Sequence, residues 1–318
     1  MSFDRPVAPL FLQWEVRPSF LKQGGVYMFH GSMVALLTPM RENGDIDYSC
    51  LRNLVDWHIA EGTDAILVMG TTGEPATLSA EEKENVIKTV VEQAHGRIPV
   101  IAGTGTNCTQ TSIEQTRRAM EIGVQACLLV TPYYNCPMQE GLYQHYRLIA
   151  EKVPIPQILY NIPKRTGVDL LPETVSRLAG ITNIVGVKEG RPAYAKAIIE
   201  QCGSNIDIYS GDDNAALEII RLGGKGVVSV LANLLPKTMH DLCEAAKNAE
   251  WDKAQALDDQ LQSFYKDLFI ETNPIPVKWL AAEHKLIPSS HLRLPLTTLS
   301  SQHQTSLKPL LDSLATFT

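Results

Sequence analysis

The feature that most constrains the fold is a regular alternation of eight short, apolar, β-rich runs with longer helical patterns, starting at Ser32. Each run is apolar at both alternating sets of positions, which is typical of parallel strands covered on both faces. Eight such units in a row favour an α/β fold, a closed (β/α)8 TIM barrel, over an open doubly wound sheet. The strand-like runs are residues 33–39, 65–71, 99–105, 126–132, 157–163, 184–190, 207–213 and 226–232.

Helical periodicity fills the intervals between these runs. Ser79 and Glu82 predict a capping box, and Pro172 predicts the first turn of a later helix. The nearest match to a dinucleotide-binding GxGxxG motif, residues 103–108, lacks the third glycine and so disfavours a Rossmann arrangement. The clearest helical stretches are residues 48–60, 80–95, 109–122 and 140–153.

The pattern divides the chain into three parts. Residues 28–250 are expected to form the catalytic barrel, and residues 251–318 a C-terminal helical appendage. Residues 1–27 precede the pattern and lack both a signal-peptide core and a cleavage site. We expect them to be a disordered extension, or the product of a mis-set start codon, with an ordered arm packed on the barrel as the alternative.

Composition excludes several classes of protein. The net charge of −7 over 318 residues argues against nucleic-acid and anionic-membrane partners. No segment reaches the roughly 18 apolar residues of a membrane span. The six cysteines form no CxxC pair and the histidines no HExxH motif, so we expect no metal site and no disulfide framework. These features favour the reducing cytoplasm.

In barrels of this class the chemistry lies at the carboxyl ends of the strands, and Lys188 follows the apolar residues 184–187 of the sixth run. A lysine that points into the barrel is desolvated, which lowers its pKa, and its neutral amine can then attack a ketone. A lysine pointing outward into solvent is the alternative. Pattern alone does not separate the two.

Other polar side chains gather at the same expected edge. Tyr160 ends the preceding run and could relay protons to a neighbour, although a core tyrosine is the simpler reading. Thr71 and Thr72 stand in a glycine-flanked turn, where they could bind a carboxylate or serve only as turn residues. Arg165 could clamp a carboxylate, or it could be a surface residue.

Asp212 and Asp213 form an acidic pair at the end of the seventh run. No third ligand stands near them in the sequence. We therefore expect a structural role in ordering a loop, and no metal.

Five motifs stand in order at these strand ends, and together they make a specific signature. The chain from about Met28 to its C-terminus resembles the dihydrodipicolinate synthase / N-acetylneuraminate lyase family. The resemblance rests on GTTGE (70–74), VTPYYN (130–135), YNIP with RTG (160–163, 165–167), GVKE (186–189) and SGDD (210–213).

The resemblance implies a Schiff-base mechanism. Lys188 would form an imine with pyruvate, and Tyr160, Thr72 and Tyr134 would make a proton relay. Tyr134 would cross into the neighbouring subunit's site, which implies a homo-oligomer, usually a dimer of dimers. No metal or organic cofactor is required, because the imine itself accepts electrons.

The resemblance also implies how substrates are held. Thr71 and Thr72 would hold the pyruvate carboxylate, and the backbone of Val228 would lie near the imine. Arg165 would receive the carboxylate of the second substrate, L-aspartate 4-semialdehyde. The reaction would be the first step of diaminopimelate and lysine biosynthesis.

Two other functions remain open from the sequence. A pyruvate-dependent aldolase acting on a sugar acid, of the N-acetylneuraminate or 2-keto-3-deoxy acid type, is the nearer one. Arg165 within RTG and the Tyr133-Tyr134 pair favour the semialdehyde branch over it. A catalytically dead scaffold is the other, and the intact set Thr72, Tyr134, Tyr160 and Lys188 argues against it.

Two departures from the family pattern bear on function. Gly190-Arg191-Pro192-Ala193 replaces a small, glycine-containing stretch beside Lys188, which puts second-substrate handling in question. Thr111, Ala80 and Lys83 stand where lysine-sensitive members carry a glutamate and a histidine or tryptophan. We predict weak or absent feedback inhibition by lysine.

Overall fold

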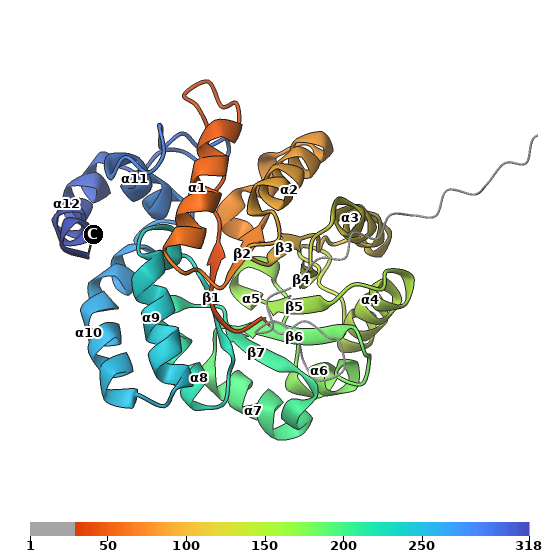
Figure 1. Cartoon of the computed structure of the whole chain (residues 1–318). Helices are drawn as coiled ribbons and strands as arrows, with labels where there is room; N and C mark the ends of the chain where they lie inside the picture. The colour runs from red at the N-terminus through yellow and green to blue at the C-terminus, as the bar shows by residue number, and fades with distance from the viewer. Residues whose placement is uncertain (1–28, 318) are drawn as a thin grey trace, which may run out of the picture.

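A computed structural model describes residues 29–317 of the 318-residue chain. Eight parallel strands follow one another around a closed barrel, with β8 paired to β1 (Figure 1). The (β/α)8 prediction is therefore confirmed, while the prediction for residues 1–27 lies outside the described residues. The strands are β1 Gly31–Ala35, β2 Ala65–Val68, β3 Val100–Gly103, β4 Ala126–Val130, β5 Gln157–Asn161, β6 Ile184–Glu189, β7 Asp207–Ser210 and β8 Gly226–Ser229.

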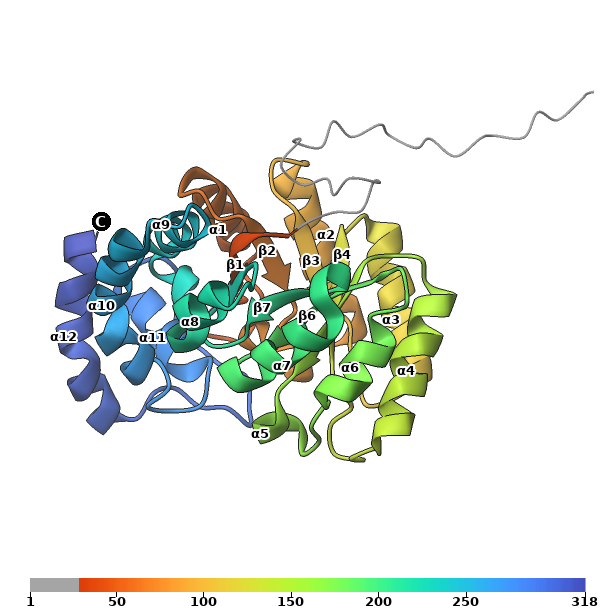
Figure 2. The same ribbon diagram turned by 90° about the horizontal axis from the view of Figure 1, so that it is seen from below.

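Helices surround the barrel, and the short helix α5 stands at one end of it (Figure 2). The capping box predicted at Ser79 and Glu82 is present, and Pro172 is the first residue of its helix. The helices are α1 Tyr48–Ala60, α2 Ala80–Ala94, α3 Thr109–Ile122, α4 Gln139–Lys152, α5 Pro163–Thr166, α6 Pro172–Leu178, α7 Pro192–Cys202, α8 Ala216–Arg221, α9 Pro236–Lys247, α10 Trp251–Asp267, α11 Ile275–Glu283 and α12 Ser301–Phe317.

The strands are shorter than the apolar runs that predicted them, because the last residues of several runs turn out of the sheet. Residues 71–73, at the end of the second run, form a separate 3-10 turn. Thr71 and Thr72 are thus loop residues, whereas Tyr160 and Lys188 stay within β5 and β6.

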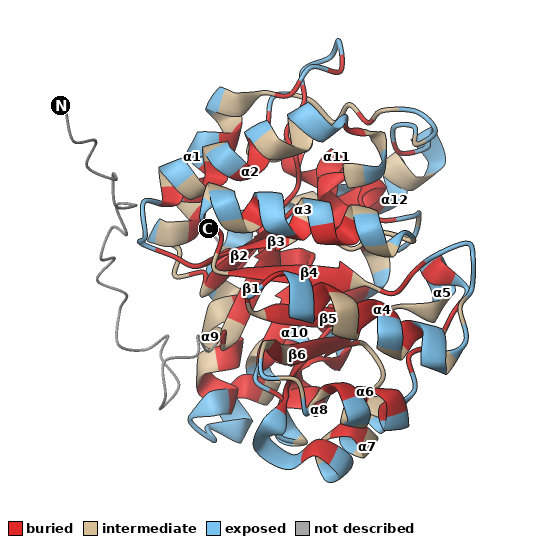
Figure 3. Ribbon diagram, turned by 90° about the vertical axis from the view of Figure 1, so that its right-hand side faces the viewer, coloured by how far each residue is buried: buried red, intermediate tan, exposed pale blue. Residues whose placement is uncertain are grey.

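Alternation along each strand separates two apolar layers. Met33, Leu67, Leu128 and Ile158 belong to a cluster inside the barrel. Their sequence neighbours pack outward against the helices. Buried residues accordingly fill the strands and the inner faces of the helices, while the outer helix faces are exposed (Figure 3). Both strand faces are apolar for this reason.

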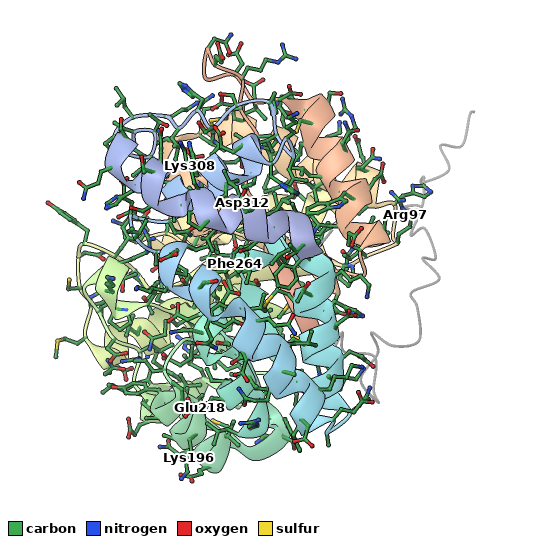
Figure 4. The ribbon with its side chains drawn as sticks, turned by 90° about the vertical axis from the view of Figure 1, so that its left-hand side faces the viewer. Arg97, Lys196, Glu218, Phe264, Lys308 and Asp312 are labelled. Carbon is green, nitrogen blue, oxygen red and sulfur yellow. The ribbon has the colours of Figure 1, made fainter. Side chains whose placement is uncertain are left out.

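The C-terminal helices lie against the outside of the barrel. Phe264 of α10 lies beside α12, whose Lys308 and Asp312 are labelled in the same view (Figure 4). The Phe264 and Phe317 rings meet edge to face with centroids 5.9 Å apart, a favourable aromatic geometry. The appendage predicted from residue 251 is helical, and its boundary with the barrel at residue 250 stays a prediction.

Candidate active site

Lys188 and Tyr160 lie side by side inside the barrel. The β5–β6 register pairs them directly, and the Lys188 Nζ atom is 4.2 Å from the centre of the Tyr160 ring. Lys188 is only 5% exposed, so the inward-facing reading is confirmed over the solvent-facing one. Two residues before Lys188, Gly186 leaves room for the Tyr209 ring, because a Cβ on Gly186 would lie 2.6 Å from Cε2 of Tyr209.

The surroundings of Lys188 favour its neutral form. Burial lowers the pKa of Lys188 to about 8, and the positive charge of Arg165 acts in the same direction. The carboxylates of Asp212 and Asp213 oppose the shift. A buried amine with this pKa is partly neutral near physiological pH and therefore nucleophilic.

The two threonines of the GTTGE motif face different partners. Burial raises the pKa of the Tyr160 phenol, and a hydrogen bond with Thr71 opposes that shift. Thr72 is buried, and its Oγ1 accepts a hydrogen bond from Asn273 Nδ2 at 3.0 Å. The hydroxyl beside Tyr160 is therefore that of Thr71, whereas the sequence reading placed Thr72 in the relay. Both threonines stand in the 3-10 turn over Thr71–Gly73.

A cavity of about 430 Å³ opens over these residues. Thr71, Tyr160, Arg165 and Asn273 are among the residues that line it. Arg165 lies on α5 and is anchored by its NH2 group, which donates to the Asn273 carbonyl oxygen at 3.1 Å. The expected carboxylate clamp thus lines the same cavity as Tyr160, whereas Thr72 and Tyr134, the other members of the expected relay, are not among its lining residues.

Tyr134 does not join this group within one chain. Its side chain is 91% exposed and its φ is +75°, in the left-handed region. Its backbone N–H donates to the Thr166 carbonyl oxygen at 3.3 Å, which fixes the turn while the ring faces solvent. Val228, in contrast, is buried in the interior cluster that also contains Tyr160.

The acidic pair after β7 divides between two tasks. Oδ2 of Asp213 accepts the backbone N–H groups of Val230 and Leu231, both at 3.0 Å, and so orders the loop after β8. Asp212 acts electrostatically on Lys188. The loop-ordering role is present, and residues 29–317 contain no group of three or more potential metal ligands.

Next to Lys188 lies a network centred on Arg191. The buried Glu189 carboxylate accepts from Arg191 Nε at 2.8 Å and from Arg191 NH2 at 2.9 Å. The same guanidinium binds both oxygens of Asp169 at 2.8 Å. Gly190, between the two, is required for close packing, since a Cβ there would lie 2.4 Å from Oδ2 of Asp212.

The sequence reading missed the contribution of the C-terminal region to this site. Asn273 links Thr72 to Arg165, and Lys278 of α11 forms an ion pair with Glu74 of the GTTGE motif at 2.5 Å. Both partners of that pair are almost fully buried. The partners are 108 residues apart for Asn273 and Arg165 and more than 200 for the other two pairs, so no local pattern could reveal the contacts.

Two further expectations concern the chain as a whole. All six cysteines are free thiols, and burial raises the pKa of Cys127 to about 12. Among the helices of the described part of the chain, none combines the length and apolar character needed to span a membrane.

Comparison with known proteins places this geometry among relatives. Residues 28–314 match the model of the Dihydrodipicolinate synthetase family. The chain is 55% identical over 283 residues to a 4-hydroxy-tetrahydrodipicolinate synthase from Nitrosococcus oceani, which covers 88% of this chain and 97% of the relative.

The chain is also similar to solved structures of dihydrodipicolinate synthases. The chloride-inhibited dihydrodipicolinate synthase from Acinetobacter baumannii, complexed with pyruvate, is 48% identical with a TM-score of 0.89, covering 91% of this chain and 99% of the other. The enzyme from Cyanidioschyzon merolae with lysine bound is 34% identical with a TM-score of 0.87, covering 90% and 98%.

Proposed function

The chain belongs to the dihydrodipicolinate synthetase family, and from that premise we propose that it condenses pyruvate, held as an imine on Lys188, with L-aspartate 4-semialdehyde. It is a lyase of this family. The observation that carries the assignment of residues is the buried Lys188 beside Tyr160 at the carboxyl ends of β5 and β6. The reaction is the first step of diaminopimelate and lysine biosynthesis.

The first half of the reaction takes place on Lys188. Its neutral amine attacks the ketone carbon of pyruvate, and the resulting carbinolamine loses water to give the imine. Tyr160 donates the proton with which the hydroxyl departs as water, and it regains a proton released from the attacking nitrogen. Loss of a proton from the pyruvate methyl group then gives an enamine, whose electrons the imine nitrogen has accepted.

The second half joins the two substrates. The enamine carbon attacks the aldehyde carbon of the semialdehyde, so a carbon–carbon bond forms and the aldehyde oxygen takes up a proton. The amino group of the second substrate then attacks the imine carbon, closes the ring and expels the Lys188 amine. The products are the cyclic hydroxy acid and one water.

We assign the remaining roles from position. Thr71 replaces Thr72 as the relay hydroxyl, because Thr71 lines the cavity together with Tyr160 while Thr72 Oγ1 is bonded to Asn273. Thr71 and Thr72 hold the pyruvate carboxylate, and the backbone of Val228 faces the imine. Arg165 binds the carboxylate of the semialdehyde bidentately, which its place in the cavity wall supports.

Tyr134 completes the relay from a second copy of the chain. A tyrosine that is 91% exposed in one chain is available to a neighbour. We therefore propose a homo-oligomer, a dimer of dimers, in which each site receives this phenol from the adjoining subunit. A cytoplasmic location is consistent with six free thiols.

A substrate comparison tests the proposal. Enzyme and pyruvate are mixed with either L-aspartate 4-semialdehyde or N-acetylmannosamine, and pyruvate consumption is followed. We expect consumption with the semialdehyde alone. Consumption only with the amino sugar would overturn the proposal in favour of a sugar-acid aldolase.

A further inference from the structure

The residue at the centre of the network beside Lys188 is Arg191. Its guanidinium uses Nε and NH2 on the two oxygens of Glu189 and uses NH1 and NH2 on the two oxygens of Asp169. It therefore makes bidentate contacts with two carboxylates at once. It also lies over the Tyr194 ring, 3.5 Å from its centre, and the Tyr194 hydroxyl donates to Asp169 at 3.0 Å.

The two carboxylates belong to different strand–loop units. Glu189 directly follows Lys188 and is the last residue of β6. Asp169 lies beyond α5, in the segment that returns from the β5 end. A charge that bridges them joins the end of β6 to the segment between α5 and α6, and it offsets the repulsion between two anions.

Asn161, the last residue of β5, binds the same two carboxylates as Arg191. It directly follows Tyr160, and its Nδ2 donates to Glu189 at 2.9 Å and to Asp169 at 2.8 Å. Its Oδ1 accepts the Leu170 N–H at 3.0 Å. The segment between Asn161 and Leu170 is thus tied at both of its ends.

That tied segment carries Arg165. On α5 the arginine has one further anchor, the Asn273 carbonyl oxygen on the far side of the cavity. Arg191 itself does not line the cavity and does not touch Lys188 in the contacts described for residues 29–317. Arg191 can therefore affect the site only indirectly, by holding the segment that carries Arg165.

We propose that Arg191 is a positioning residue for the second substrate: by bridging Glu189 and Asp169 it fixes residues 162–170, which include α5, so that Arg165 meets the incoming carboxylate. The inference rests on the proposed function. It also explains how the altered stretch 190–193 serves this enzyme, because the arginine that departs from the family pattern is the one that holds the loop.

The test compares the KM for the semialdehyde with the KM for pyruvate. In Arg191→Ala, Glu189 and Asp169 lose their shared partner and the loop relaxes, so the KM for L-aspartate 4-semialdehyde should rise about ten-fold or more. The KM for pyruvate and the yield of the pyruvate adduct trapped by borohydride should stay at wild-type values. A purely structural role would lower kcat through loss of active enzyme and leave both KM values alone.

Two variants control the experiment. Arg177→Ala removes a similar arginine, which binds Glu140 at 2.8 Å and lies over the Tyr143 ring at 3.9 Å without touching a strand end. It should leave every parameter unchanged. Arg191→Lys keeps the charge but cannot bridge two carboxylates, so it should recover only part of the semialdehyde KM.

The outcomes are distinct. An unchanged semialdehyde KM in Arg191→Ala, or a parallel rise in the pyruvate KM, would overturn the inference. If the alanine variant does not fold, Arg191→Lys decides, because a wild-type semialdehyde KM there would equally overturn the bridging role. A wild-type enzyme that yields no pyruvate adduct would refute the proposed function itself, a failure that no Arg191 variant can produce.

Discussion

The Nζ atom of Lys188 lies 4.2 Å from the centre of the Tyr160 ring, and the two residues are direct neighbours in the β5–β6 register. Because both are buried in the barrel interior, an amine and a phenol share one desolvated site. Removing the phenol oxygen alone tests what it contributes. In Tyr160→Phe the ring stays in place, so the fold should persist while proton transfer is lost.

We expect Tyr160→Phe to lower kcat about 10²–10⁴-fold, the range of a positioned acid–base group. Steady-state kinetics with both substrates measure this. Circular dichroism should match the wild type. A variant that keeps near-wild-type kcat would remove Tyr160 from the relay.

Imine formation should depend on pH through Lys188. Its pKa is lowered to about 8, and the neutral amine, which is the nucleophile, gains population as the pH rises. The rate of pyruvate imine formation should therefore climb through pH 8 and level off above it. Since the Arg165 charge lowers this pKa, Arg165→Ala should move the midpoint upward, whereas Arg165→Lys should keep it near the wild-type value. A downward shift in Arg165→Ala would contradict the electrostatic account.

Replacing Arg165 should impair use of the semialdehyde but not adduct formation with pyruvate. Arg165→Ala removes a bidentate partner of a carboxylate, so the KM for the semialdehyde should rise about 10–100-fold. Trapping with pyruvate at a pH well above the midpoint should give the wild-type yield. Equal loss of both steps would mean that Arg165 has another role.

The buried pair Lys278–Glu74 should be important for stability. In Lys278→Ala the Glu74 carboxylate is left buried without its partner, which should cost about 3–5 kcal/mol of unfolding free energy. Lys237→Ala, which breaks the exposed pair with Asp241, should cost about 0.5 kcal/mol or less. Urea unfolding of both variants compares the two environments directly. Equal losses would show that burial does not govern the effect.

Regulation by lysine should be weak. Lys83 lines the cavity, and Thr111 offers no carboxylate for the ammonium group of a bound lysine. A titration of activity with L-lysine should show little loss at low millimolar concentrations. Strong inhibition there would contradict the prediction, and Thr111→Glu should increase sensitivity if the missing carboxylate is the cause.

Much of the site follows from strand periodicity. Alternation along β6 puts Lys188 on the inner face and Val187 on the outer one, and a closed barrel brings Tyr160 next to it. Strand alternation does not predict which of Thr71 and Thr72 faces Tyr160, because both residues lie in a 3-10 turn and not in the strand.

Long-range contacts explain what else escaped prediction. Asn273 meets Thr72 across 201 residues, so its place in the site depends on how α11 docks on the barrel. The sequence places Arg191 close to Lys188, yet the folded loops decide which two carboxylates it binds. Tyr134 is 91% exposed in the single chain, and the motif that contains it does not indicate this direction.

The central claim is that Lys188 carries pyruvate covalently. The most direct measurement is the intact mass of the protein after incubation with pyruvate and reduction with borohydride, for the wild type and for Lys188→Ala. The account predicts one reduced pyruvate adduct per chain in the wild type, assigned to Lys188 by peptide mapping, and none in the variant. No adduct in the wild type, or an adduct that survives Lys188→Ala, would contradict it.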